Sequence, residues 1–201
     1  MIARTVTVRL LPEDIAQQTA LNKLSGAARY VWNIFLRRIR DRQEYSRLSK
    51  IVTGNEYPPP DVSEDALHAE FDDLMLRGEL KSVAMHDPSI LKNELSELAE
   101  AWPRALRRGE YPKFRERKHP RAFALDSVDL MGDCLIVPGV GAVPMGMVDK
   151  ELVGQPIRAT VRRGKGQAFS ARLECHPQLV TSVERSARFN RMSPVPAALA
   201  I

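Results

Sequence analysis

PIRATVRRGKGQAFSARLE, residues 156–174, is the clearest strand–turn–strand pattern in the chain. Apolar and polar residues alternate on both sides of a glycine-containing centre, Gly164-Lys165-Gly166. Alternation of this kind is typical of half-buried strands, and a short glycine-containing link between two of them is typical of a hairpin. We therefore predict antiparallel strands at 156–163 and 169–174, with residues 162–167 at the hairpin tip.

Other short strand-like runs lie outside this hairpin. AFAL at 122–125 and CLIV at 134–137 are separated by glycine and proline breaks, and ARTVTVRL at 3–10 alternates with Val6 and Val8 on one side. The run at 3–10 has no local partner, so we expect it to join the later strands. The predicted fold class is α+β, a small antiparallel β-barrel with an inserted α-helical domain. The predicted parts are residues 1–10 (first barrel strand), 11–110 (helical insert), 111–175 (remainder of the barrel) and 176–201 (irregular tail).

The first helical region is predicted as two helices. Residues 13–24 follow Pro12 and carry a short apolar stripe, Ser25-Gly26 interrupts the chain, and residues 27–48 carry a longer stripe that includes Val31 and Phe35. Residues 13–48 are thus expected to form a helix-turn-helix in the loose sense. The stretch from Lys50 to Ser63 contains Pro58-Pro59-Pro60 and is expected to be a loop.

Two further helices are predicted at 64–76 and from Asp87-Pro88 onward. Asp87 suits the N-cap, and proline suits the first helical position. Pro103 is expected to kink or end the second of these helices. Trp32 and Trp102 fall within apolar helical stripes and are predicted to be core residues.

Basic and acidic residues are segregated along this chain of net charge +5. Residues 61–100 hold eleven carboxylates against three basic residues, whereas 37–50, 104–121 and 158–172 are rich in arginine and lysine. Three basic segments together predict a charged face that binds polyphosphate, although each alone could be solvated surface. The acidic block is expected to be a solvated helix surface.

Several classes of protein are disfavoured by the sequence. No run of 18 apolar residues predicts a membrane span, and the N-terminus lacks the apolar region of a signal peptide. Cys134 and Cys175 have no CxxC spacing, so we expect a reduced, cytoplasmic protein. Cys175-His176 lacks the spacing of a metal site. No cofactor, metal or catalytic residue is predicted.

A succession of short motifs resembles a known family. In chain order the motifs are Val8-Arg9-Leu10-Leu11-Pro12, Ala28-Arg29-Tyr30-Val31-Trp32-Asn33, Gly109-Glu110-Tyr111-Pro112-Lys113-Phe114-Arg115 and Leu135-Ile136-Val137-Pro138-Gly139-Val140-Gly141, followed by the 156–174 hairpin. Over about residues 1–175 this order resembles the N-terminal lobe of TnpB (transposon OrfB), an RNA-guided nuclease related to type V CRISPR effectors. The resemblance implies that the β part is a wedge domain and the helical insert a recognition domain. Together these would hold a guide RNA scaffold and read a short duplex motif beside the target.

The sequence departs from the family after Glu174. The resemblance implies a RuvC-like nuclease that opens with an aspartate in a Gly-Ile-Asp-Leu-Gly type strand, but Cys175-His176-Pro177-Gln178 follows here. The CxxC pairs of the family's zinc ribbon are also missing from this sequence. Two-metal cleavage needs clustered acidic ligands, and only Glu184 is acidic beyond residue 174. We therefore expect a non-catalytic lobe, truncated before the nuclease.

The strongest candidates for nucleic-acid contact surround Phe114 and His119, where basic residues offer phosphate contacts beside a stacking ring. A basic solvated linker is the alternative. These candidates are Lys113, Arg115, Arg117, Lys118 and Arg121.

Two further groups of candidates lie elsewhere. Arg29 and Asn33 are four residues apart on one helix, where Asn33 could address a base edge, or the two could be a polar pair near the core. Strand and hairpin-tip residues suited to backbone phosphates are Arg4, Arg9, Arg162, Arg163 and Lys165.

The sequence thus predicts a lobe that binds structured guide RNA, double-stranded DNA or both. A separate nuclease-lobe protein is a further potential partner. Two alternatives stay open: a sequence-specific helix-turn-helix DNA-binding regulator that uses residues 13–48, and a decayed transposon fragment without a role of its own.

Overall fold

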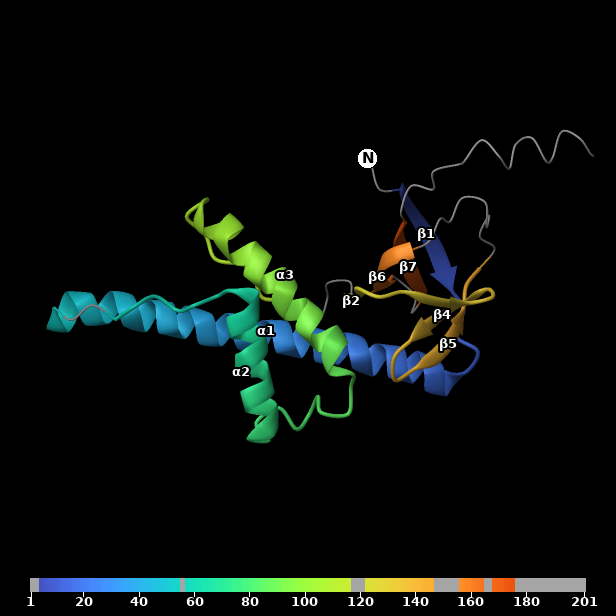
Figure 1. Ribbon diagram of the computed structural model, residues 1–201, viewed down its shortest axis with the longest axis horizontal. Coiled ribbons are helices and arrows are strands. Elements are labelled where there is room, and N and C mark those ends of the chain that lie inside the picture. Colours follow the sequence, from blue (N-terminus) through green and yellow to red (C-terminus); the bar gives the residue numbers. More distant parts are fainter. Residues whose placement is uncertain (1–3, 55–56, 117–121, 147–155, 165–167, 176–201) are drawn as a thin grey trace, which may run out of the picture.

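The computed structural model describes residues 4–54, 57–116, 122–146, 156–164 and 168–175, and Figure 1 shows the helices extending from one side of a β part. In these ranges the fold is mixed, with three helices and two antiparallel sheets. The elements are β1 Arg4–Leu10, α1 Ile15–Thr53, α2 Glu64–Leu76, α3 Pro88–Leu106, β2 Ala122–Leu125, β3 Asp129–Met131, β4 Cys134–Val137, β5 Gly141–Pro144, β6 Pro156–Arg163 and β7 Phe169–Cys175.

The larger sheet has the strand order β1-β7-β6-β2 and is antiparallel throughout. β6 and β7 pair from Arg163 and Phe169 at the hairpin end, which confirms the predicted hairpin strands. β1 pairs with β7 along its whole length, from Arg4 opposite Cys175 to Leu10 opposite Phe169. The prediction that the strand at 3–10 joins the later strands is therefore confirmed.

The smaller sheet has the order β3-β4-β5 and meets the larger one at the end of β1. Leu10 forms an isolated bridge with Met145, and the Leu11 amide donates to the Pro144 carbonyl oxygen at 2.8 Å. Within the described residues neither sheet closes on itself, so the predicted barrel is not confirmed and two open sheets stand in its place. β3 and β5 were not predicted, because their residues, DLM and GAVP, lack the continuous apolar runs that marked β2 and β4.

The inward face of the larger sheet forms one hydrophobic core with the smaller sheet and the first half of α1. It contains seventeen buried residues, with Phe123, Val161 and Leu173 from the sheet beside Leu21 and Leu24 from α1. A second core joins the three helices, where Phe35 of α1 lies 6.4 Å from Phe71 of α2 between ring centroids. α1 therefore contributes its first half to the sheet core and its middle to the helical core.

The predicted break at Ser25-Gly26 is wrong, because α1 is one helix of 39 residues. The Ser25 hydroxyl donates to the Leu21 carbonyl oxygen at 2.8 Å and is buried. Leu24 and Ala27, on either side of the two residues, are buried as well. Glycine inside a helix costs about 1 kcal/mol relative to alanine, which burial on both sides offsets. α1 also continues to Thr53 and ends at Gly54, so the predicted loop begins later than Lys50.

α2 and α3 begin where local capping signals predicted. The Ser63 side chain accepts a hydrogen bond from the Ala66 amide, and the Asp87 side chain accepts one from the Ser89 amide. α2 has the predicted bounds, whereas α3 passes through Pro103 and ends one turn later at Leu106. Trp32 and Trp102 are both buried in the helical core, as predicted.

Replacing Gly26 with alanine tests the continuity of α1. A Cβ atom at Gly26 would meet no atom within 4 Å, so Gly26→Ala is expected to raise the free energy of unfolding by about 0.5–1 kcal/mol. Gly54 has a φ of 72°, so Gly54→Ala is expected to lower it by about 1 kcal/mol. Urea unfolding measures the free energy of unfolding of both variants and of the wild type. Destabilisation by Gly26→Ala would show that a turn with positive φ interrupts the helix in solution.

Candidate nucleic-acid interface

The outward face of the larger sheet carries three exposed arginines from three strands. Arg9 of β1 lies opposite Ser170 of β7, which in turn lies opposite Arg162 of β6. Arg172 of β7 stands in the neighbouring row, between Thr7 and Thr160. Neighbouring strands are about 4.8 Å apart, so Arg9 and Arg162 are separated by about 10 Å. We call Arg9, Arg162 and Arg172 the basic sheet face, because all three are exposed on one side of the sheet.

The arginines of β6 do not all belong to this face. Arg163 is half-buried and occupies the same strand register as Val161, on the side opposite to Arg162. Arg158 shares the register of Arg162, but its guanidinium group lies 3.0 Å from Asp126 and 3.5 Å from Glu97. These carboxylates neutralise Arg158, and Arg162 is the exposed arginine among the described residues of β6.

Residues 111–116 lie along α1 and include the last five residues of the Gly109–Arg115 motif. We call them the 111–116 segment. The Trp32 indole nitrogen donates to the Lys113 carbonyl oxygen at 3.1 Å, and the Tyr111 hydroxyl donates to Glu44 at 3.1 Å. The Arg40 guanidinium group lies 5.0 Å from the centroid of the Tyr111 ring. The segment is thereby attached to three successive parts of α1.

Asn33 attaches the same segment through its side-chain amide. Its Nδ2 atom donates to the Arg115 carbonyl oxygen at 3.0 Å, and its Oδ1 atom accepts from the Arg115 amide at 2.8 Å. Both ends of the Asn33 side-chain amide are thus hydrogen-bonded within the protein. This favours the prediction of a polar residue near the core over the prediction that Asn33 contacts a base edge. Arg29 lies on the same helix and is half-buried.

The Arg115 side chain lies between α1 and α3. Its guanidinium group is 4.0 Å from the centroid of the Trp32 ring, pairs with Glu94, and lies 2.9 Å from Glu97. Glu94 is buried, so the expectation that the whole acidic block is solvated surface is wrong at this residue. Burial raises the pKa of the Glu94 carboxyl to about 7, against the opposing effect of Arg115. Contact of Arg115 with nucleic acid stays a prediction, and these partners give it an internal role.

Lys113 and Phe114 remain on the surface of the 111–116 segment. Lys113 is exposed, Phe114 is 37% exposed, and the Arg40 guanidinium group lies 5.4 Å from the centroid of the Phe114 ring. A cavity of about 510 Å³ lies along the segment, with Arg40, Lys113 and Phe114 in its lining together with Glu110. A ring with cations on either side can stack a base and contact its phosphates.

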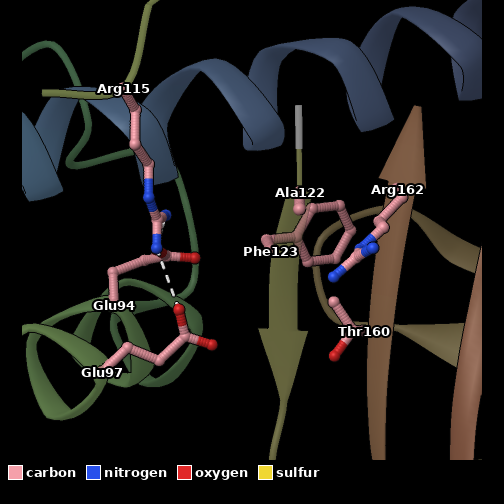
Figure 2. A pocket seen from close by; sticks show the side chains of 7 residues that line it. All are labelled: Glu94, Glu97, Arg115, Ala122, Phe123, Thr160 and Arg162. Carbon is pink, nitrogen blue, oxygen red and sulfur yellow. Dashed lines mark hydrogen bonds and ion pairs between the residues drawn. The ribbon is translucent and has the colours of Figure 1, made fainter. Parts of the chain in front are cut away.

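A second cavity, of about 350 Å³, lies between α3 and the larger sheet. Figure 2 shows Glu94, Glu97 and Arg115 on one side of it, with Phe123, Thr160 and Arg162 on the other. Arg162 therefore belongs both to the basic sheet face and to this cavity.

The remaining sequence candidates divide into two groups. Arg4 lies on β1 at the end that pairs with Cys175. Four candidates lie outside the described residues, namely Arg117, Lys118, Arg121 and Lys165. Arg172 and Arg40 belong to the interface but were not singled out. Apolar and polar residues alternate in FSARLE, and this pattern could have predicted that Arg172 points outward, opposite to the buried Ala171. The contacts of Arg40 could not have been predicted in this way, because they depend on Tyr111 and Phe114, far away in the sequence.

Comparison with known families accounts for the first strand and most of α1. Residues 1–46 match the family model HTH_OrfB_IS605, described as a helix-turn-helix domain. This match supports membership of the N-terminal region in the TnpB/OrfB transposon family. No curated protein matches the chain. In this chain the matched residues from Ile15 onward form part of one uninterrupted helix.

The described residues contain neither a membrane-spanning helix nor a cluster of metal-ligating side chains. None of the helices there is long and apolar enough to cross a bilayer. Groups of three or more His, Cys, Asp or Glu side chains that could hold a metal ion are likewise not found in this part of the chain.

The raised pKa of Glu94 predicts an unusual dependence of stability on pH. Between pH 4.5 and about 7 the folded chain holds a proton on Glu94 that the unfolded chain has released. This residue therefore makes the free energy of unfolding fall as pH rises through that window, and level off above it. The free energy of unfolding of Glu94→Gln, relative to that of the wild type, should rise across the window by up to about 3 kcal/mol.

Urea unfolding at a series of pH values measures this difference. Glu100→Gln is the matched control, because Glu100 is an exposed glutamate on the same helix. Its unfolding free energy should follow that of the wild type across the pH series. A Glu94→Gln curve that also runs parallel to the wild type would show that the buried carboxyl does not titrate in this range.

Proposed function

We propose that this chain is a non-catalytic nucleic-acid-binding lobe, related to the N-terminal part of TnpB-like RNA-guided nucleases. The helix-turn-helix domain of the OrfB family suggests DNA binding by a transposon-associated protein. The observation that carries the proposal is the basic sheet face, where three exposed arginines from three strands stand among serine and threonine side chains. Such a face suits phosphate oxygens, which accept hydrogen bonds from both residue types.

The proposed ligand is a structured guide RNA, with duplex DNA beside the target as the second ligand. The sheet face supplies contacts to a backbone of either kind, since it presents charge and hydroxyl groups. The 111–116 segment adds Phe114, a ring that suits an unpaired base and not a closed duplex. A structured RNA offers both features, namely paired backbone and unpaired bases. The nuclease activity of the family would then require a separate protein as partner.

The alternative, a regulator that reads DNA with two helices from residues 13–48, loses its geometric basis. A helix-turn-helix places its second helix in the major groove while the first crosses the backbone. α1 continues through Ser25-Gly26, so no second helix is set at an angle to the first.

Isolation of the chain from its native host, with sequencing of the bound nucleic acid, tests the proposed ligand. One enriched structured RNA is the expected result, and the triple variant Arg9→Gln, Arg162→Gln, Arg172→Gln should lose it. Heterogeneous nucleic acid that moderate salt removes from both proteins equally would contradict the proposal, and would favour a decayed fragment.

The same triple variant should bind RNA in vitro with a weaker dependence on salt. Each phosphate contact removed lowers the slope of log affinity against log salt by about 1, so the slope should fall by about 3. Fluorescence anisotropy with one labelled structured RNA over a salt series measures it. Arg104→Gln is the control, because Arg104 is an exposed arginine of α3 that pairs with Glu100. An unchanged slope in the triple variant would exclude the sheet face as the binding surface.

Phe114→Ala should weaken binding to single-stranded RNA about tenfold and leave binding to a duplex unchanged. Stacking needs the ring, so Phe114→Tyr should retain the affinity of the wild type. Anisotropy with a labelled oligonucleotide and with its duplex form compares the variants. If Phe114→Ala lost as much affinity for the duplex as for the single strand, or if Phe114→Tyr lost as much affinity as Phe114→Ala, Phe114 would stabilise the 111–116 segment and would not stack on a base.

A further inference from the structure

We propose that the cavity between α3 and the larger sheet binds one unpaired nucleotide with a guanine base, and that Glu97 reads the base while Arg162 contacts the phosphate. The inference rests on the proposed function, since it assigns a specific nucleotide subsite beside the basic sheet face. It concerns seven residues, namely Glu94, Glu97, Arg115, Ala122, Phe123, Thr160 and Arg162.

One wall of the cavity carries two carboxylates and the Arg115 guanidinium group that pairs with them, and the other wall carries the Arg162 guanidinium group. Figure 2 shows the Glu97 carboxylate of α3 and the Arg162 guanidinium group of β6 turned toward each other across the space. The Thr160 side chain stands on the wall of Arg162. A ligand that satisfies both walls must carry hydrogen-bond donors at one end and negative charge at the other. A nucleotide has this character, because its base edge donates and its phosphate is anionic.

The Glu97 carboxylate is held in position by two arginines, of which Arg115 also lines the cavity. Arg115 Nη2 lies 2.9 Å from Glu97 Oε2, while Arg158 Nη2 lies 3.5 Å from Glu97 Oε1. The Glu97 side chain nevertheless keeps 36% of its surface exposed, whereas that of Glu94 keeps 1%. Glu97 is therefore the carboxylate that a ligand can reach, and Glu94 and Arg115 act as positioning residues.

The size of the cavity fits a single nucleotide. Its volume of about 350 Å³ lies at the lower end of the range for small-molecule sites, about 300–1,000 Å³. Ala122 leaves space on the sheet side where a larger residue would fill it, and Phe123 forms an apolar part of the lining. One base with its ribose and phosphate matches this volume, and a base pair exceeds it.

The acceptor wall selects guanine among the four bases. The Watson–Crick edge of guanine presents an imino N–H and an amino group side by side, which match the two oxygens of one carboxylate. Adenine and cytosine present an amino group beside a ring nitrogen that accepts, so a carboxylate there meets repulsion. Uracil presents one N–H between two carbonyl groups. A site built to accept hydrogen bonds discriminates strongly against ligands that cannot donate them.

The position of Arg162 connects this cavity with the basic sheet face. Arg162 stands in the row of Arg9 and Ser170 and also lines the cavity. A strand whose phosphates cross this row would thus bring one nucleotide to the cavity mouth. An unpaired base in a structured RNA enters such a pocket at little cost, because no base pair has to be opened.

The test is binding of the four nucleoside monophosphates to the full chain, measured by saturation-transfer NMR and equilibrium dialysis. GMP is expected to bind about tenfold more tightly than AMP, CMP or UMP. Glu97→Gln should remove this preference, since the amide presents a donor where the base also donates. Glu100→Gln, one turn further on the same helix, should retain it. Ala122→Leu should abolish GMP binding by filling the cavity without changing a charge.

The possible outcomes distinguish failure of the nucleotide subsite from failure of the proposed nucleic-acid binding by the sheet face. Equal binding of the four nucleotides, or unchanged GMP preference in Glu97→Gln, would overturn the proposed subsite. Absence of GMP binding, with long structured RNA still bound in a salt-dependent manner, would overturn it as well and would mean that Glu97 and Arg162 satisfy each other. Loss of long RNA binding in the wild type would instead remove the proposed function and this inference with it.

Discussion

The pairing of Arg115 with Glu94, above the Trp32 ring, joins three parts of the chain that are distant in sequence. Glu94 is buried, and the Arg115 guanidinium group lies 4.0 Å from the Trp32 ring centroid. Removing one partner of a buried ion pair costs about 3–5 kcal/mol, because the other charge is left uncompensated. The packing of the 111–116 segment against α1 and α3 therefore depends on this contact.

The same part of α3 is also attached to the larger sheet. Glu97 reaches Arg158 of β6, and the Asn93 amide donates to the Ala124 carbonyl oxygen of β2 at 3.2 Å. Residues 93–97 thus determine how the helices and the sheet are oriented. This orientation places the basic sheet face and the surface of Phe114 on the two sides of one ion-pair network. A hydrophobic contact of equal area would stabilise the packing without specifying this geometry, since apolar contacts have no preferred direction.

Features with local causes were predictable from the sequence. α2 and α3 begin at side-chain caps, Ser63 and Asp87, whose hydrogen bonds reach only two or three residues ahead. β6 and β7 alternate strongly and are close together in the sequence, so their pairing follows from their own residues. The match of β1 to β7 could be inferred because a half-buried strand without a neighbour must find one elsewhere.

Features that depend on distant partners were not predictable. Ser25-Gly26 favours a break by propensity, but Leu24 before it packs in the sheet core and Ala27 after it packs in the helical core. The barrel depended on the position of β3 and β5, which were not predicted. A basic run likewise shows its charge without showing which carboxylates will neutralise it. The prediction that Arg115 is free for phosphate could not foresee Glu94, twenty-one residues earlier in the chain.

The pairing of charges in the fold decides which of the three basic segments can bind phosphate. On α1, Arg38 and Arg42 both contact Glu70 of α2, and Arg47 contacts Glu44. The acidic block therefore neutralises much of the basic charge on the helices. The sheet segment keeps Arg162 and Arg172 exposed, because β-strand alternation turns them away from the hydrophobic core. Part of the basic charge on α1 is thus paired with carboxylates while these two arginines stay exposed, which favours the sheet over the long basic helix as the surface to which polyphosphate is expected to bind.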